Sequence, residues 1–233
     1  MNRITVWLYA INICLALGVV VVFGVGTSGR QITGTISGFV TVDEAPEQRV
    51  VSVTTDQVVC GNEVEDRATV VAHSGGVANA VVIVIGASWG DAKPDPEINN
   101  AGCYFVPRVQ VAATRSVVTV KSEDDTLHTT HAYDDRQRTL FNIAIPFPGL
   151  EIDRPLSRPG PVRIECDSHG WMRGWIYVTD DIGTVTASDG GFELTGIPPG
   201  RYELQVWHEQ YEGRSQPVMV SPGGAVEVSF KLQ

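Results

Sequence analysis

Seven consecutive residues combine a thiol, an imidazole and a thioether, in the order Cys-x2-His-x2-Met: Cys166-Asp167-Ser168-His169-Gly170-Trp171-Met172. These are soft or borderline ligands, which suit copper better than a hard cation. Copper electron-transfer sites use two His and one Cys in a trigonal plane, with a weak axial Met. Since this loop holds one His, the second must come from elsewhere in the chain.

The candidates for the second imidazole lie upstream, in Leu127-His128-Thr129-Thr130-His131, after the β-rich run 116–120. A His at one strand end and a Cys/His/Met loop near the next converge at one end of a β-sandwich. Alternation along the strand places His128 and His131 on opposite faces. We therefore expect His131 to be structural or to lie at the rim of the site.

The loop 166–172, followed by Arg173-Gly174, resembles the copper loop of amicyanin-type cupredoxins. The upstream His-x2-His also matches that family, in which the first His is the ligand. The resemblance implies a type 1 copper site that transfers one electron and performs no catalysis. Carried over by position, its ligands are His128, Cys166, His169 and Met172.

More distant features resemble the cupredoxin-domain proteins labelled methylamine-utilisation proteins, over roughly Ile32 to the C-terminus. They are Cys60-Gly61, Cys103-Tyr-Phe-x-Pro, the run 198–202 and Trp207-His208-Glu209. Two positions depart from the family pattern. Ser122 stands where relatives place an Asn that ties the ligand loops together, and Gly170 stands where Pro follows the loop His. Both changes bear on the rigidity and potential of the site, because surrounding contacts orient the ligands.

Short Val- and Thr-rich runs broken by Gly, Pro and Asp are typical of an all-β protein. The near-continuous apolar run 77–85 predicts a fully buried central strand, whereas 89–102, with two Pro and paired Asn, predicts a loop. The strand and turn pattern indicates a Greek-key cupredoxin β-sandwich. Further strands are expected at 50–54, 106–111, 116–121, 140–145, 162–166 and 175–179.

After Asp180-Asp181 the sequence resembles the transthyretin-like, carboxypeptidase-regulatory-like module. Residues 202–207 alternate apolar and polar positions, as a half-buried strand does. The module is short for an independent sandwich, so we expect it to pack on the cupredoxin region or to use the strand 39–42. The predicted domains are 1–31 (membrane anchor or signal segment), 32–179 (cupredoxin-like) and 180–233 (β module).

Residues 4–25 form an apolar run that is long enough to span a bilayer, which takes roughly 20 residues. It is also compatible with a cleaved signal peptide. No convincing small-x-small site follows it and no lipobox precedes Cys14, so we favour an uncleaved anchor. Arg3 before the run keeps the N-terminus inside and places the rest in the periplasm or cell exterior. Cleavage and release into the periplasm is the alternative.

Export makes disulfides possible. Cys14 lies in the apolar run and Cys166 in the copper loop, which leaves Cys60 and Cys103 in the exported part. We expect these two to be bridged, which contributes about 3–4 kcal/mol by the chain-entropy model. Two buried free thiols are the alternative.

The formal net charge of −10 argues against nucleic acid or an anionic membrane surface as a partner. It favours a basic redox protein partner, or simply a solvated surface. Trp171 and Trp175 flank the loop and are read either as an apolar docking patch or as core residues. His169 is expected to reach the surface and to give electrons an exit.

Two other His residues have plainer interpretations: His208 as a structural residue at a strand end, and His73 as an exposed residue in a turn. Two rival functions also remain open from the sequence. One is a copper carrier or storage protein, which uses the same ligands without redox work. The other is a metal-free interaction module that keeps the cupredoxin fold.

Overall fold

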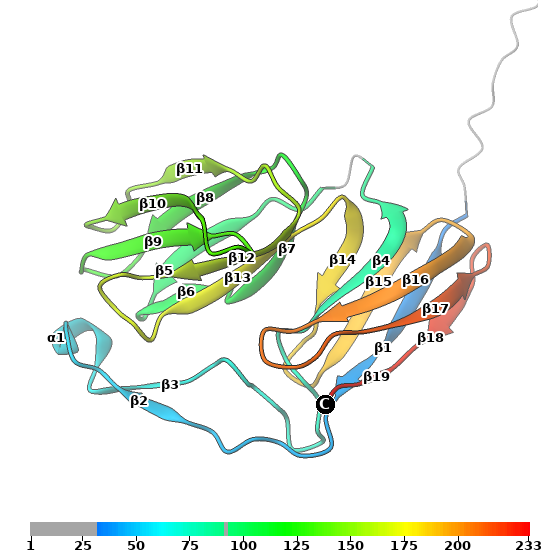
Figure 1. The fold of residues 1–233 in the computed structure, drawn as a ribbon, viewed down its shortest axis with the longest axis horizontal. Coiled ribbons are helices and arrows are strands. Elements are labelled where there is room, and N and C mark those ends of the chain that lie inside the picture. Colours follow the sequence, from blue (N-terminus) through cyan, green and yellow to red (C-terminus); the bar gives the residue numbers. More distant parts are fainter. Residues whose placement is uncertain (1–31, 91–92) are drawn as a thin grey trace, which may run out of the picture. The chain divides into compact units, whose positions relative to one another are not determined.

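The computed structural model of the protein describes residues 32–90 and 93–233. Apart from one four-residue helix, the regular elements in these ranges are strands, so the predicted all-β class is confirmed (Figure 1). The predicted N-terminal anchor or signal segment, 1–31, lies outside the described residues. Within the described part of the chain, no helix has the length and apolar character needed to cross a membrane.

The elements follow the chain in this order: β1 (Gly34–Thr41), β2 (Val50–Ser52), α1 (Gln57–Cys60), β3 (Glu63–Glu65), β4 (Val81–Ser88), β5 (Glu97–Ala101), β6 (Tyr104–Val106), β7 (Val109–Ala112), β8 (Val117–Ser122), β9 (His128–Tyr133), β10 (Thr139–Ile145), β11 (Ile152–Pro155), β12 (Gly160–Glu165), β13 (Arg173–Val178), β14 (Asp181–Val185), β15 (Gly191–Ile197), β16 (Gly200–Trp207), β17 (Arg214–Val220), β18 (Ala225–Glu227) and β19 (Phe230–Lys231).

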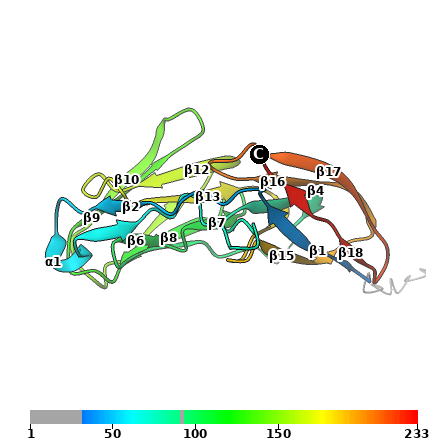
Figure 2. The same cartoon turned by 90° about the horizontal axis from the view of Figure 1, so that it is seen from below.

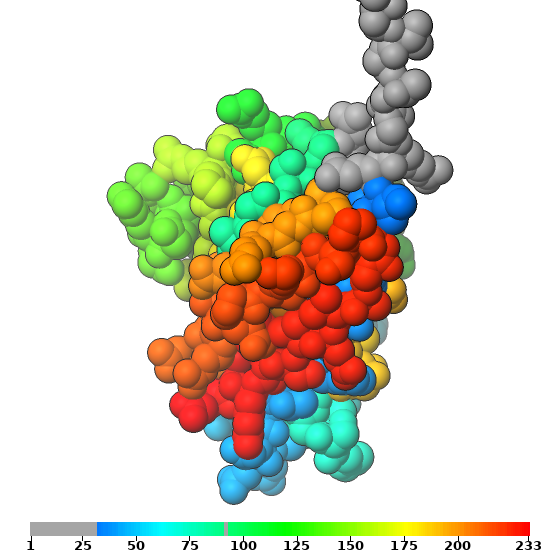
Figure 3. Space-filling model, turned by 90° about the vertical axis from the view of Figure 1, so that its right-hand side faces the viewer, coloured from blue at the N-terminus to red at the C-terminus, as the bar shows by residue number. Residues whose placement is uncertain are grey.

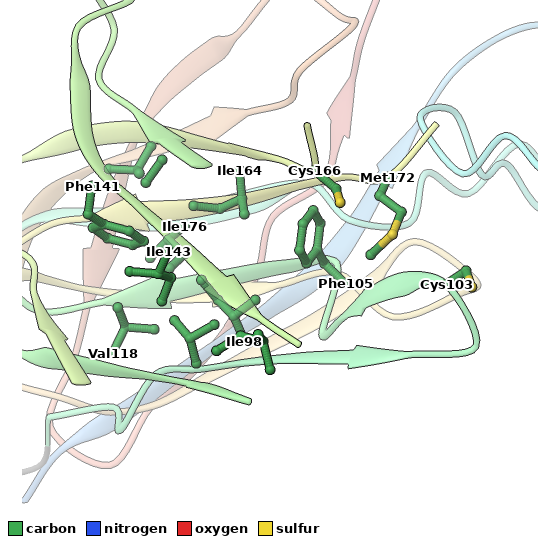
Figure 4. Packing of buried hydrophobic residues seen from close by; sticks show 14 of the residues in the cluster. Ile98, Cys103, Phe105, Val118, Phe141, Ile143, Ile164, Cys166, Met172 and Ile176 are labelled. Carbon is green, nitrogen blue, oxygen red and sulfur yellow. The ribbon is translucent and has the colours of Figure 1, made fainter. Parts of the chain in front are cut away.

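Strands β5 to β13 form a first sandwich of two sheets, ordered β10-β9-β12-β13-β7 and β11-β8-β5-β6. Alternating apolar residues of both sheets meet in one core, because successive side chains of a strand point to opposite faces. Figure 4 shows Cys166, Met172 and Phe105 toward one end of this core, away from Phe141. The copper-loop candidates thus belong to the end of a packed interior.

A second sandwich is formed by the sheet β14-β4-β16-β17 and by β15-β1-β18, with β19 also paired to β1. The C-terminal strands, in orange and red, cover most of the face seen in Figure 3. β1 pairs with β15 through Phe39 and Gly191, which confirms that the C-terminal module uses the strand near 39–42. β4 also lies in this sandwich, although it precedes the predicted boundary. The domain limits 32–179 and 180–233 stay a prediction about separate folding units.

Residues 43–75 leave the second sandwich and return to it. Thr41 forms a bridge with Gly76, and the Val42 N–H donates to the Gly75 carbonyl over 2.9 Å, which closes the base of this excursion. The excursion contains β2, α1 and β3, and its tip packs on the first sandwich. Figures 1 and 2 both show α1 at the end of the first sandwich near β9.

The buried central strand predicted at 77–85 is confirmed in part: β4 begins at Val81, and Val81 to Val84 are at most 1% exposed, whereas Ile85 is 39% exposed. The predicted loop at 89–102 is wrong for its second half, where β5 pairs with β8 and β6. Ile98 of β5 is buried, and the amide groups of Asn99 and Asn100 donate to Glu123 and to the Lys121 carbonyl. These bonds satisfy the amide N–H groups of two residues whose propensity favours a turn, while Oδ1 of Asn99 and Oδ1 of Asn100 are buried without a hydrogen-bond partner among the described residues.

Candidate metal centre

Three predicted ligands come together at one end of the first sandwich. His128 is the first residue of β9, and Cys166 directly follows β12. β9 and β12 are paired neighbours, with Glu165 opposite His131, so their ends meet. The loop from β12 to β13 then folds back and presents His169. Both imidazoles are fully buried and Cys166 is 4% exposed, so the site is closed to bulk water.

The donor atoms of these three side chains face one another. Nδ1 of His128 and Nδ1 of His169 are 3.0 Å apart, and Sγ of Cys166 lies 4.0 and 3.6 Å from them. A triangle with these sides has a circumscribed radius of about 2.1 Å (the product of the sides divided by four times the area), and metal bonds to His nitrogen and Cys sulfur measure about 2.0–2.3 Å. One ion therefore fits at bonding distance from all three atoms without rearrangement.

Each imidazole is held from behind by a carboxylate. Nε2 of His128 lies 2.9 Å from Oδ2 of Asp124, and Nε2 of His169 lies 2.9 Å from Oδ2 of Asp56. Asp124 is fixed in turn by the N–H groups of Gly102 and Cys103, at 2.7 and 2.8 Å. Such carboxylate–histidine pairs orient metal-bound imidazoles and raise their basicity. Neither aspartate was identified from the sequence.

These contacts fix which ring nitrogens are free. An ionised carboxylate only accepts hydrogen bonds, so the Nε2 atoms carry the protons and both Nδ1 lone pairs point inward. Burial lowers the pKa of His128, and the neighbouring His169 lowers it further, against the opposing effect of Asp124. His128 is therefore neutral near pH 7 and able to bind a metal. Two lone pairs 3.0 Å apart form an arrangement that a shared cation stabilises.

Thr129 ties the two ligand segments together. Its backbone N–H donates to Sγ of Cys166 over 3.3 Å, and its hydroxyl accepts from the N–H of Asp167 over 2.6 Å. The Ser122 hydroxyl bonds to the backbone of Asn100 on the neighbouring strand β5 and to the backbone of Asp124. Thr129 thus makes a connection between the loops that the Ser122 side chain does not make. A Cβ added at Gly170 would meet no atom within 4 Å, so the side of the loop after His169 is open there.

Met172 is 1% exposed and lies in the same core cluster as Cys166. Its N–H donates to the His169 carbonyl over 2.9 Å, and its carbonyl accepts from the N–H of Cys166 over 3.4 Å. The loop is thereby closed into a tight turn, and Figure 4 shows the Met172 side chain directed into the core near Cys166. The thioether is therefore within the apolar end of the site.

The remaining His residues lie away from the centre. His131 faces outward, as alternation predicted, and its Nδ1 lies 2.9 Å from Oδ1 of Asp167. His73 is exposed in a turn. His208 is 4% exposed, and its Nδ1 accepts from the N–H of Gln210 over 3.1 Å. These positions agree with the structural or surface roles expected for all three residues.

The expectation that His169 reaches the surface is wrong. Its ring is fully buried, because Asp56 on the excursion bonds to the nitrogen that would otherwise be exposed. Trp171 packs beside it, with ring centroids 5.0 Å apart, and lines a cleft of about 660 Å³. Trp175 instead contacts Trp207 and donates to Glu209, so the two tryptophans do not form one patch.

The structure has a disulfide between Cys60 and Cys103, the pair expected from the sequence, with Cα atoms 5.5 Å apart. Cys60 ends α1, which follows Asp56, and Cys103 supplies one of the N–H groups that hold Asp124. One covalent bond thus connects the segments that carry the two carboxylate contacts.

Comparison with known proteins gives partial likenesses. The family model of the carboxypeptidase regulatory-like domain matches residues 176–233, in agreement with the module expected there. A search of curated proteins found no match. Similar solved structures are cupredoxins: a novel purple cupredoxin from Nitrosopumilus maritimus is 18% identical, with 36% of this chain and 100% of that chain covered and a TM-score of 0.33.

Two further structures show the same level of likeness. A reduced Cu(I) form of an amicyanin variant is 15% identical, over 42% of this chain and 97% of that chain, with a TM-score of 0.31. A Cu-containing nitrite reductase from Thermus scotoductus is 19% identical, over 38% of this chain, with a TM-score of 0.32. This chain covers 23% of that enzyme. Scores this low establish neither a shared fold nor a function, and the methylamine-utilisation type stays a prediction.

Proposed function

We propose that the protein is an exported copper protein with a type 1 site, which carries single electrons to or from a protein partner. The observation that carries this proposal is the triangle of His128 Nδ1, His169 Nδ1 and Cys166 Sγ, which encloses a point at metal-bonding distance from all three atoms. Two imidazoles and one thiolate with a weak Met are the ligand set of copper electron-transfer sites.

Each side chain has a distinct task in this proposal. His128, His169 and Cys166 would hold the metal, and Met172 would add a weak thioether donor. Copper bound there supplies a one-electron couple. The N–H of Thr129 donates to the Cys166 sulfur, and Asp124 and Asp56 keep the two rings from rotating. Side chains held this firmly would rearrange little when a bound metal changes its oxidation state, which favours rapid electron exchange.

The cell location and partner belong to the same proposal. The apolar run 4–25 and the Cys60–Cys103 disulfide favour a protein exported to the periplasm or cell exterior, anchored by its N-terminal segment. The net charge of −10 favours a basic protein partner. Because His169 is covered, Trp171, which contacts it and lines the cleft, is the side chain that leads from the site to the surface.

The test is the visible spectrum of the purified protein after loading with Cu(II) and desalting. We expect an intense thiolate-to-copper charge-transfer band in the wild type, its loss in Cys166→Ser, and its retention in the surface control His73→Gln. Absence of the band together with loss of copper on desalting would contradict the proposal and favour a metal-free interaction module. Retained copper without a reversible one-electron potential would favour a copper carrier or storage protein.

A further inference from the structure

Residues Val53–Val64, which we call the cover, lie against the metal centre but belong to neither sandwich. Oδ2 of Asp56 is 2.9 Å from Nε2 of His169, and the hydroxyl of Thr55 donates to the Ser168 carbonyl over 3.4 Å. Both contacts join the cover to the loop between β12 and β13. They explain why the His169 ring has no exposed surface.

Asp56 occupies a position where aspartate has another common task. It precedes α1, and an aspartate there usually accepts a hydrogen bond from the first turn of its helix. Its side chain makes no such bond, and its backbone has φ 53°, a left-handed conformation that is unfavourable for residues other than Gly, Asn and Asp. The carboxylate is directed to His169 instead.

The other side of the cover is fixed by a covalent bond and by apolar packing. The disulfide joins Cys60 to Cys103, whose N–H holds Asp124 behind His128. Val53, Cys60 and Val64 are buried in the same core cluster as Cys166 and Met172. The Val53 N–H also donates to the Asn62 carbonyl over 2.8 Å, so the cover closes on itself. The cover is therefore held in place at the end of the first sandwich that carries the candidate metal centre.

We propose that the cover is a closed barrier over the metal centre, held by the disulfide and latched by Asp56, which is a positioning residue for His169. It keeps thiol reagents, chelators and partner proteins from direct contact with Cys166 and His169. Metal exchange and thiol modification then require the cover to open. This proposal rests on the proposed metal site, but the barrier itself is measurable without metal.

The first experiment uses the metal-free full chain and measures the rate of Cys166 alkylation by iodoacetamide. Peptide mass mapping separates Cys166 from Cys14. In Asp56→Gly the latch is lost while the left-handed backbone conformation remains easy to adopt. We expect this variant to react at least about tenfold faster than the wild type, the scale set by one hydrogen bond to a charged group. Asp56→Asn retains an uncharged hydrogen-bond acceptor, so its Cys166 alkylation rate should lie between those of the wild type and Asp56→Gly.

The matched control is Glu63→Gln, which removes an exposed carboxylate from the same segment without touching the site. In Glu63→Gln, Cys166 should be alkylated at the same rate as in the wild type. A purely structural role of Asp56 predicts instead that alkylation rises only in step with a lower unfolding midpoint. Equal alkylation rates in the wild type and Asp56→Gly, or a rate increase that follows global unfolding, would overturn the proposal.

Two further readouts distinguish a positioning role from a failed metal site. In ¹⁵N-labelled metal-free protein, the Nε2–H of His169 should give an observable resonance in the wild type and Asp56→Asn, and lose it by exchange with water in Asp56→Gly. In the copper-loaded protein, a chelator should remove the metal at least about tenfold faster from Asp56→Gly than from Glu63→Gln. Failure to load copper would refute the proposed function but leave the alkylation and resonance results valid as tests of the cover.

Reduction tests the covalent side of the barrier. An external dithiol supplies two electrons and two protons to the Cys60–Cys103 bond, which yields two thiols here and a disulfide in the reagent. We expect faster Cys166 alkylation after this treatment, and in the paired variant Cys60→Ala with Cys103→Ala. Unchanged Cys166 reactivity in a reduced protein that remains folded would contradict the role of the disulfide in holding the cover.

Discussion

Asp124 lies 2.9 Å behind Nε2 of His128, on the side of the ring opposite the nitrogen that faces Cys166 and His169. The carboxylate also accepts hydrogen bonds from the N–H groups of Gly102 and Cys103. The residue therefore joins the ligand strand to the turn that carries the disulfide. Its position places it directly behind one corner of the candidate metal centre.

The first prediction follows from this contact. Asp124→Asn should lower copper affinity by about 10–100-fold, the usual cost of losing a carboxylate that orients a metal-bound His. Competition with a chromophoric chelator measures this. The matched control is Asp125→Asn, since Asp125 is the exposed neighbour of Asp124. Equal copper affinities of Asp124→Asn and Asp125→Asn would mean that Asp124 stabilises only the turn at Gly102 and Cys103 and does not orient His128.

A second prediction contrasts the two faces of β9. His128→Gln should lose stoichiometric copper, because it removes one corner of the donor triangle. His131→Gln should keep it, since His131 points away from the centre and bonds to Asp167 and Thr139. Metal analysis after desalting checks both variants. Copper loss in the His131 variant and retention in the His128 variant would reverse the assignment of faces.

The sequence indicated which donor side chains lie together better than it indicated their surroundings. The resemblance to a copper loop pointed to Cys166, His169 and Met172, and strand alternation separates His128 from His131. The structure brings His128, Cys166 and His169 together. Asp56 contacts His169 across 113 positions of sequence, and nothing near Asp56 marks it as different from any other surface aspartate. The burial of His169 depends on this distant contact, which is why its exposure was predicted wrongly.

The prediction of strands was limited in the same way, because contacts between residues far apart in the sequence decide some of them. The Val-rich run of β4 was recognisable in the sequence as a buried strand, because burial on both faces of a sheet gives a continuous run of apolar residues. β5 did not, because Asn99 and Asn100 favour turns locally and become acceptable only through bonds to Glu123 and the Lys121 carbonyl. The use of β1 by the second sandwich was anticipated because the C-terminal module was too short for a complete sandwich.

A third prediction concerns Met172. Met172→Leu has nearly the same volume, so the core should tolerate it at a cost below about 1.5 kcal/mol. Loss of the thioether removes a weak donor that stabilises the oxidised ion, so the reduction potential should rise. Each tenfold loss in the relative stability of that state raises a one-electron potential by about 59 mV. Voltammetry of the loaded protein measures the shift, and an unchanged potential would exclude Met172 as a ligand.

The fourth prediction concerns His208, which is buried beside Tyr211. Burial lowers the pKa of His208 to about 4, and the charge of Arg108 adds to this while Glu209 opposes it. The unfolded chain, with an ordinary His, binds a proton below about pH 6.5 that the folded protein binds only near pH 4. The stability that His208 provides as a neutral residue is therefore fully present above pH 6.5 and is lost as the pH falls through this window.

The loss amounts to about 3 kcal/mol at most, from a shift of this size. Urea unfolding of the metal-free protein from pH 7 to pH 4 measures it, with His208→Gln as the reference that lacks the titrating group. The stability difference between wild type and His208→Gln should shrink as the pH falls, because other groups titrate equally in both proteins. A difference that stays constant across this range would show that His208 is protonated in the folded protein as easily as in the unfolded chain.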